Sequence, residues 1–170
     1  MTKTPDTFLD LNDIPRRVPA LADLTLADIP PRVGLFPLSG AMILPGGHLP
    51  LTVFEPRYVA LLEDALAGRR LIGMIQPQEE DESDPLPVLH NIGTLGRITS
   101  FTEYSDGTFS ITLLGITRFR LLMEGLTQRG WREGTIDASP FFSDLLESDP
   151  SPINRARLLS RLKSYLTAHQ

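Results

Sequence analysis

The segment Val53-Phe-Glu-Pro-Arg-Tyr58 decides how this chain folds, because it marks the point where a strand passes into a helix. Pro56 suits the first turn of a helix, where a missing N–H costs nothing. Gly68 suits the position just after a helix end. Between them, apolar residues recur at helical spacing: Val59, Leu62 and Leu66. We therefore predict a strand over residues 48–54 and a helix from Pro56 to about Gly68.

Short apolar runs on both sides of this segment predict further strands. One run covers residues 33–38, and the turn Pro45-Gly46-Gly47 separates it from the strand over residues 48–54. Pro50 lies inside that second strand and has no N–H to donate, which indicates a sheet edge or a bulge. The run Leu71-Ile-Gly-Met-Ile-Gln76 is compact and apolar, and predicts a buried strand.

The second half of the chain has the pattern of a β meander. Residues 92–104 are strand-like, but their apolar alternation slips around Gly96, which predicts a bulge there. Asp106-Gly107 is a hairpin turn. Alternation resumes over residues 109–114 and again around Phe119, and a last strand is expected over residues 131–138. With the helix after Pro56 and one near the end of the chain, the pattern predicts a small barrel, mainly β with helices (α+β).

The two ends of the chain differ from its centre. Residues 1–32 contain five prolines among scattered leucines, and we interpret them as an arm that is partly docked or, alternatively, disordered. Residues 33–138 are expected to form the barrel. Residues 139–170 are expected to be a loop and an amphipathic helix that begins near Ser151-Pro152. Its stripe consists of Leu158, Leu159, Leu162, Tyr165 and Leu166. This stripe needs a partner surface and no stop signal follows, so either the helix packs on the barrel or residues beyond it are missing. We hypothesise that the native chain extends past Gln170, which an intact mass would test.

Composition excludes several classes of function. The chain has no cysteine, so it has neither disulfides nor thiolate metal sites nor a cysteine nucleophile. Its three histidines, His48, His90 and His169, are too far apart to suggest a zinc site. Only two of the sixteen basic residues are lysines, and no phosphate-binding loop motif occurs. We therefore predict no metal, no cofactor and no ATP-driven chemistry.

Charge and hydropathy bear on partners and location. The net charge is −5, and residues 79–84 contain five acids, without which the rest of the chain is neutral. No basic excess favours nucleic acid. No apolar stretch is long enough to span a membrane, and the N-terminus lacks a secretory signal, so a cytoplasmic protein is expected.

A series of motifs from about Val33 to Ile136 resembles the amino-terminal substrate-binding domain of Lon proteases. The resemblance is specific because the motifs occur together in the right order and spacing. They are Leu35-Phe-Pro-Leu38, Leu44-Pro-Gly-Gly47, Leu49-Pro-Leu51, Val53-Phe-Glu-Pro-Arg-Tyr58, Ala65-Leu-Ala-Gly68, Ile92-Gly-Thr94, Arg97-Ile98 and Gly115-Ile-Thr-Arg-Phe-Arg120.

This resemblance implies a PUA-like pseudobarrel, with six strands around a closed core and a helix after the FEPRY element, residues 54–58. In Lon proteases the domain helps to gather unfolded or tagged substrates for a separate ATPase and peptidase. Cereblon, an adaptor in ubiquitin ligation, looks similar in this region. This chain resembles a stand-alone bacterial form without the ATPase and peptidase.

The FEPRY element is the most specific motif in the chain and the first candidate binding site. In a structural interpretation, Phe54 and Tyr58 fill the end of the barrel, Pro56 starts the helix, and Glu55 and Arg57 find charged or backbone partners. In a functional interpretation, an apolar cleft beside these residues holds an extended peptide.

Arg118 and Arg120 share one face of a strand and are further candidates. They either pair with carboxylates or anchor an acidic partner. The acidic loop is either a solvated connection or a filter that favours basic partners.

Three functional hypotheses remain at this point. The first is a non-enzymatic module that binds unfolded or tagged polypeptides or a partner protein in protein quality control. The alternative is an RNA-binding protein of the PUA-like class, which the charge disfavours. The third is a hydrolase with a nucleophile beside His48 or His90, although no catalytic constellation is evident.

Overall fold

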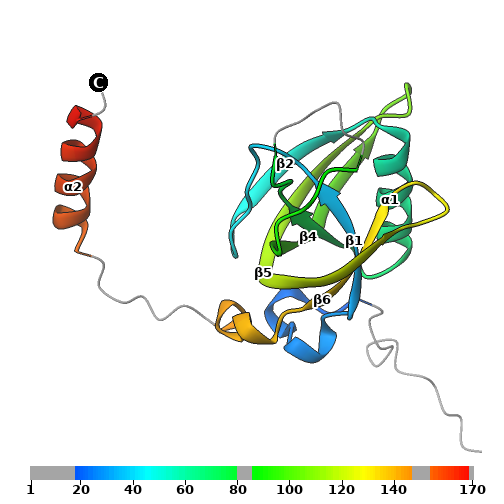
Figure 1. Cartoon of the computed structure of the whole chain (residues 1–170), viewed down its shortest axis with the longest axis horizontal. Coiled ribbons are helices and arrows are strands. Elements are labelled where there is room, and N and C mark those ends of the chain that lie inside the picture. The colour runs from blue at the N-terminus through cyan, green and yellow to red at the C-terminus, as the bar shows by residue number, and fades with distance from the viewer. Residues whose placement is uncertain (1–17, 80–85, 147–153, 169–170) are drawn as a thin grey trace, which may run out of the picture.

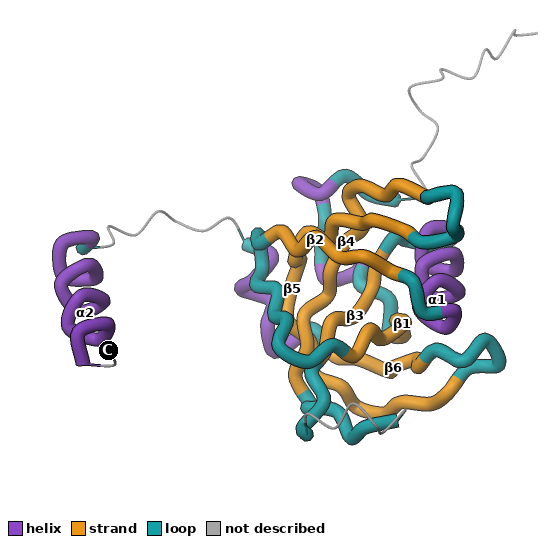
Figure 2. The backbone as a smooth tube through the Cα atoms, turned by 90° about the horizontal axis from the view of Figure 1, so that it is seen from above, coloured by secondary structure: helices purple, strands orange, loops and turns teal. Residues whose placement is uncertain are grey.

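The structure is a computed structural model of the 170-residue chain, and it describes residues 18–79, 86–146 and 154–168 (Figure 1). Six strands form one sheet in the order β2-β5-β4-β3-β1-β6. The strands are β1 (Arg32–Pro37), β2 (His48–Val53), β3 (Leu71–Ile75), β4 (Ile92–Glu103), β5 (Phe109–Leu126) and β6 (Arg132–Asp137). The helix α1 (Pro56–Ala67) lies between β2 and β3 in the chain and packs along one side of the sheet (Figure 2). The α+β class with six strands is confirmed.

The long strand β5 curls the sheet. It pairs with β2 over residues 109–114, with β4 over residues 109–120, and with β6 from Arg120 onward. Residues 109–114 and 118–121, which the sequence suggested as separate strands, belong to this one strand of 18 residues. β2 pairs with β5 alone among the described strands, so the expected closed six-stranded barrel is wrong in this detail. The edge position of β2 is the reason that it accommodates Pro50.

Several local predictions are confirmed. α1 begins at Pro56 and its C-cap is Gly68, and all five residues of β3 are buried. The pairing of β4 with β5 shifts register between Leu95 and Gly96, which is the expected bulge. The hairpin between these strands turns at Gly107, whose φ is 81°. Turn-forming residues and the alternation of apolar side chains were therefore sufficient to predict the helix ends, the bulge and the hairpin turn.

Two apolar clusters fill the interior, one on each side of β1. Leu35 belongs to the cluster around Phe119 and Leu95, whereas Phe36 belongs to the cluster around Tyr58 and Leu113. Alternate side chains of a strand point to opposite faces, so β1 is buried on both. β1 therefore divides the core, and the FEPRY element lies on the side of Phe36.

Irregular segments cover the cluster around Phe119. The short 3₁₀ helices η1 (Leu21–Asp23) and η2 (Leu26–Asp28) precede β1, and Leu24 and Ile29 pack on this cluster. Arg97 donates to the Pro19 carbonyl at 2.7 Å, which fixes this segment to β4. Residues 139–145, expected as loop, form the 3₁₀ helix η3 (Ser139–Leu145), and Leu145 packs on the same cluster.

The helix α2 (Arg155–Ala168) lies near the end of the chain. Its first turn is capped, because the Arg157 N–H donates to Oδ1 of Asn154 at 3.0 Å. The expected start at Ser151-Pro152 lies outside the described residues. The apolar stripe of the helix is exposed to solvent, at Leu158, Leu159, Leu162, Tyr165 and Leu166.

Candidate functional site

The FEPRY element turns the chain sharply from β2 into α1. Glu55 occupies the N-cap of α1 in an extended conformation, and its carbonyl accepts the N–H groups of Tyr58 and Val59, each at 2.9 Å. Pro56 fits because an N–H at this position would have no partner within the helix. This geometry directs Phe54 outward and Tyr58 inward, since their exposed fractions are 65% and 9%.

A groove of about 520 Å³ opens beside this element. Its walls come from the end of β1, the end of β2 with the FEPRY element, the start of β6 and two prolines that flank the acidic loop. Its lining residues are Phe36, Pro37, Leu38, Ser39, Leu51, Thr52, Val53, Phe54, Glu55, Arg57, Tyr58, Pro77, Pro87, Gly130, Trp131 and Arg132. Its volume lies within the range of small-ligand and short-peptide sites.

Two aromatic rings stack at the groove. Tyr58 lies against Phe36 with ring centroids 4.3 Å apart and an angle of 23° between the planes. Burial raises the pKa of Tyr58, since the charged phenolate would be desolvated. The expectation that Phe54 also fills the barrel end is wrong, because the extended backbone before α1 turns this ring to solvent at the groove wall.

The charged side chains at the groove are held in ion pairs. Arg57 donates to Oε2 of Glu55 at 3.0 Å from Nε, and its guanidinium lies 4.7 Å from the centre of the Tyr58 ring. Arg132 pairs with Glu124 and donates to the Pro87 carbonyl at 2.6 Å. Such paired side chains hold the walls in place without giving the groove a strong net charge.

Trp131 also lines the groove, and it was not predicted as a site residue. Its Nε1–H donates to Oδ2 of Asp64 on α1 at 3.0 Å. Arg129 reaches the same helix and pairs with Glu63 and Asp64. The available signal was the single tryptophan of the chain at the start of a strand. Its partner is 67 residues away in sequence, so no local pattern shows the contact.

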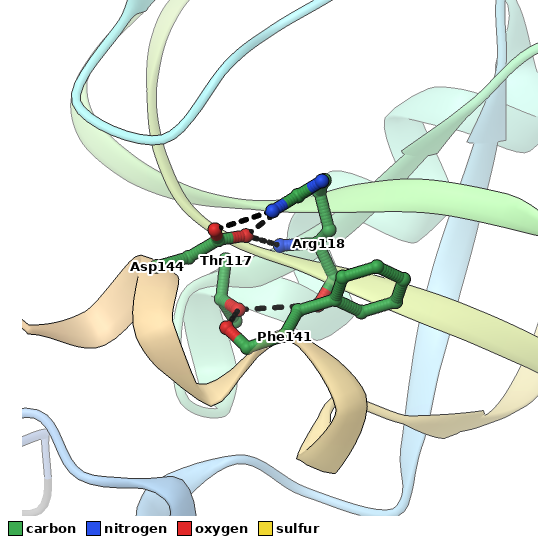
Figure 3. A network of polar contacts seen from close by, with 4 residues as sticks. All are labelled: Thr117, Arg118, Phe141 and Asp144. Carbon is green, nitrogen blue, oxygen red and sulfur yellow. Dashed lines mark hydrogen bonds and ion pairs between the residues drawn. The ribbon is translucent and has the colours of Figure 1, made fainter.

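Arg118 and Arg120 do not join the FEPRY groove. Nε and Nη2 of Arg118 donate to the two carboxylate oxygens of Asp144, both at 2.8 Å, and its guanidinium lies 4.8 Å from the ring centre of Phe141 (Figure 3). These bonds lower the pKa of Asp144. Arg120 lies on the same exposed face, where its charge contributes to the lowered pKa of Asp137 after the larger effect of hydrogen bonds from Ser139.

Arg118 also lines a second groove, of about 360 Å³, between the residues after β1 and the start of β4. Because Asp144 already occupies the Nε/Nη2 edge of the Arg118 guanidinium, an acidic partner that binds this edge would have to displace that carboxylate. The structure therefore separates the predicted site residues into the FEPRY groove and a closed ion pair.

His48 and His90 are exposed, and the described part of the chain contains no group of three or more histidine, aspartate or glutamate residues that could hold a metal ion. Within the described ranges, no helix has the length and hydropathy needed to cross a membrane.

The chain was compared with models of known protein families. The family model described as the ATP-dependent protease La (LON) substrate-binding domain matches residues 32–168. This chain belongs to that family. The resemblance inferred from the FEPRY element and the motifs around it is therefore confirmed, and it extends through η3 and α2.

Relatives of the Lon substrate-binding domain family are found in several bacteria. Lon protease 4 of Sorangium cellulosum is 37% identical over 116 residues, which cover 67% of this chain and 14% of that protein. Lon protease 2 of Myxococcus xanthus is 30% identical over 112 residues, which cover 65% and 13%. The matched region is thus a small part of these relatives, which are several times longer than this chain.

Solved structures of the family share the fold. A Lon N-terminal domain protein from Xanthomonas campestris aligns with a TM-score of 0.51 and 30% identity, over 62% of this chain and 58% of that one. The N-terminal domain of the Mycobacterium avium complex Lon protease gives a TM-score of 0.51 over 80% of this chain and 72% of that one. At 12% identity, the second likeness concerns the fold alone.

Proposed function

We propose that this chain is a non-catalytic recognition domain that binds extended segments of unfolded or tagged polypeptides in the FEPRY groove. The proposed setting is protein quality control in the cytoplasm, where the domain presents its ligand to a separate protease. In this proposal residues 33–138 form the recognition unit, residues 1–32 are an arm, and residues 139–170 are a connecting segment with a helix.

The observation that carries the proposal is an exposed phenylalanine at the wall of an otherwise well-packed groove. Phe54 is 65% exposed, whereas Tyr58, four residues later, is 9% exposed. A large apolar side chain beside a concave surface provides affinity for another apolar side chain, because both lose contact with water on binding. Membership of a substrate-binding family supports a polypeptide as that ligand.

The lining of the groove favours an extended polypeptide as the ligand. It combines apolar and aromatic side chains from the end of β1, the FEPRY element and Trp131 directly before β6. An extended peptide presents alternate side chains on one face, so its apolar residues can contact such a lining. Arg57 and Arg132 are already paired with Glu55 and Glu124, which favours recognition through apolar contacts over strong charge selection.

The test is a titration of fluorescently labelled α-lactalbumin, made permanently unfolded by reduction and alkylation, followed by fluorescence anisotropy. We expect saturable binding of the unfolded form and none of the native form. Phe54→Ala should weaken the binding about tenfold or more, as loss of an aromatic anchor does. Phe142→Ala is the matched control, because Phe142 is 53% exposed but does not line the groove.

Each alternative has its own result in this experiment. Equal binding of native and unfolded protein, or equal weakening by both variants, would contradict a specific unfolded-chain site. Displacement of the probe by structured RNA at low salt, lost as salt is raised, would support the RNA-binding alternative instead.

A further inference from the structure

We infer that the FEPRY groove binds its polypeptide by strand addition to the free edge of β2, through the backbone of Thr52. This inference rests on the proposed function and names the binding mode of the same site. It follows from which backbone groups of β2 are already paired with β5 and which point away from the sheet.

The pairing of β2 with β5 fixes the direction of each backbone group. Gly115 N–H donates to the Gly47 carbonyl at 2.9 Å and the Gly115 carbonyl accepts the Gly46 N–H at 2.8 Å, so Gly46 and Gly47 form a bulge opposite Gly115 in which the Gly47 carbonyl points toward β5. The register runs without a shift from His48 opposite Leu114 to Val53 opposite Phe109. In an antiparallel ladder, hydrogen-bonded and non-hydrogen-bonded pairs alternate. Thr52 opposite Ser110 is therefore a non-hydrogen-bonded pair, as is Pro50 opposite Thr112.

The other side of β5 agrees with this assignment. Tyr104 N–H donates to the Thr108 carbonyl at 2.9 Å, and the pairing of Thr102 with Ser110 keeps the same register. The N–H and C=O groups of Ser110 therefore point toward β4 and not toward Thr52. The backbone groups of Thr52 consequently point to the free edge of β2.

Pro50 determines how much of this edge is usable. An N–H at this position would also point to the free edge. Because proline has none, the centre of the strand lacks one donor. This gap disfavours pairing of β2 with β2 of a second copy, which would need the whole edge. The groups that remain toward the end of this edge are the Pro50 carbonyl and the N–H and C=O of Thr52. Thr52 lines the groove next to Phe54 and is exposed.

Strand addition explains how the site would select unfolded chains. A folded protein has already paired nearly all of its buried backbone groups, whereas an extended unfolded segment offers free N–H and C=O groups. The backbone contacts tolerate many sequences. Phe54 and the aromatic groove then favour segments with an apolar residue at the position that faces them.

The decisive variant is Thr52→Pro, compared with Thr52→Val. Proline removes the N–H that points to the free edge and breaks no bond to β5, as Pro50 already does two residues earlier. Valine keeps the N–H and a similar shape. With the unfolded α-lactalbumin probe we expect Thr52→Pro to bind about tenfold more weakly and Thr52→Val to bind like the wild type.

A second measurement on the wild-type chain does not depend on the proline variant folding. Hydrogen exchange followed by NMR should show that the Thr52 amide becomes protected when the unfolded probe binds, more than the Gly107 amide at the distant hairpin. Absence of this protection at saturating probe would overturn strand addition.

The outcomes separate the two proposals. Wild-type affinity in Thr52→Pro, with weakening by Phe54→Ala, would overturn strand addition and leave the proposed function standing. Equal loss in Thr52→Val and Thr52→Pro would assign the effect to the side chain and also overturn it. A dimer of the chain that Thr52→Pro abolishes would make a second copy the occupant of the edge. No binding of the probe by the wild type would overturn both proposals.

Discussion

The two apolar clusters of this domain are closed in different ways. The cluster around Phe119 is covered by Leu24 and Ile29 from the segment before β1 and by Leu145 of η3. Beside it, Asp144 of η3 holds Arg118 with two hydrogen bonds (Figure 3). The cluster around Tyr58 borders the groove, where Phe54 and the edge of β2 meet solvent. The difference is that packed segments cover one cluster, whereas the other borders an exposed apolar surface, as the proposed binding site requires.

The largest effect should come from the closed side, with Phe119→Ala. Phe119 is 0% exposed, and a Cβ added at Gly93 would lie 2.5 Å from its ring, so the ring packs directly on the backbone of β4. We expect a loss of about 3–5 kcal/mol in the free energy of unfolding, since a large cavity forms. Urea unfolding followed by Trp131 fluorescence measures it.

The control for this cavity is Phe101→Ala, which removes an exposed ring on the same strand pair. Its effect should stay within about 0.5 kcal/mol. A loss of less than about 1 kcal/mol for Phe119→Ala would show that the Phe119 cluster is not the tightly packed half of the core.

A smaller effect is expected from Asp144→Asn, which weakens the contact of η3 with Arg118. The pKa of Asp144 is lowered in the folded state, so its charge stabilises the fold above the ordinary aspartate pKa, and this contribution is lost as the pH falls through the folded value. The variant should melt at a lower temperature than the wild type at pH 7, by less than Phe119→Ala does.

Acid should remove this difference between the variant and the wild type. The wild-type carboxylate becomes protonated only as the pH falls below the ordinary aspartate pKa and through the lowered folded value, and there the two melting temperatures should converge. Asp106→Asn is the comparison variant, because hydrogen bonds from Thr108 also lower the pKa of Asp106 but hold a hairpin turn and not η3. A difference for Asp144→Asn that does not depend on pH would show that the ion pair does not hold η3 in place.

Much of this arrangement follows from local sequence. Pro56 and Gly68 delimit α1, the slip at Gly96 marks the bulge, and Pro50 indicates an edge strand, because each of these features depends on near neighbours. The order of motifs was sufficient to find the family. The alternation of side chains did not predict β5 as a single strand. The inward side chains of β5 belong first to the Tyr58 cluster and then to the Phe119 cluster, so the alternation changes phase within the strand and suggests two.

The candidate site could be predicted only in part, for a related reason. The FEPRY residues are contiguous, so the sequence shows them together. Trp131 and Asp64 meet only in the folded chain. For Arg118 the sequence left pairing with a carboxylate and anchoring of an acidic partner open, because Asp144 lies in a segment that was predicted to be a loop, although it forms η3. Phe54 and Tyr58 are both aromatic, so residue type does not show which of them is buried. The turn into α1 decides it.

On the open side, Trp131→Phe should cost about 1 kcal/mol in the free energy of unfolding, the typical net contribution of one hydrogen bond. The variant keeps an aromatic ring but removes the donor to Asp64. A double-mutant cycle with Asp64→Asn, measured by circular dichroism in urea, isolates the interaction between the two side chains. A coupling energy near zero would show that Trp131 contributes only its ring to the groove, and that Arg129 alone ties this segment to α1.

The smallest effect on stability should come from Phe54→Ala, within about 0.5 kcal/mol, because its ring remains 65% exposed in the folded chain. Tyr58→Ala removes the buried ring that stacks on Phe36. It should lower the free energy of unfolding by more than about 2 kcal/mol, measured for both variants by urea unfolding. A loss of 2 kcal/mol or more for Phe54→Ala would mean that the ring is packed against the groove in solution, and the open side would then be closed like the other. Unchanged stability together with weakened binding of unfolded protein would instead assign Phe54 to recognition. In that case the apolar surface of Phe54 leaves water only when a partner covers it, so its free energy contributes to binding and not to folding.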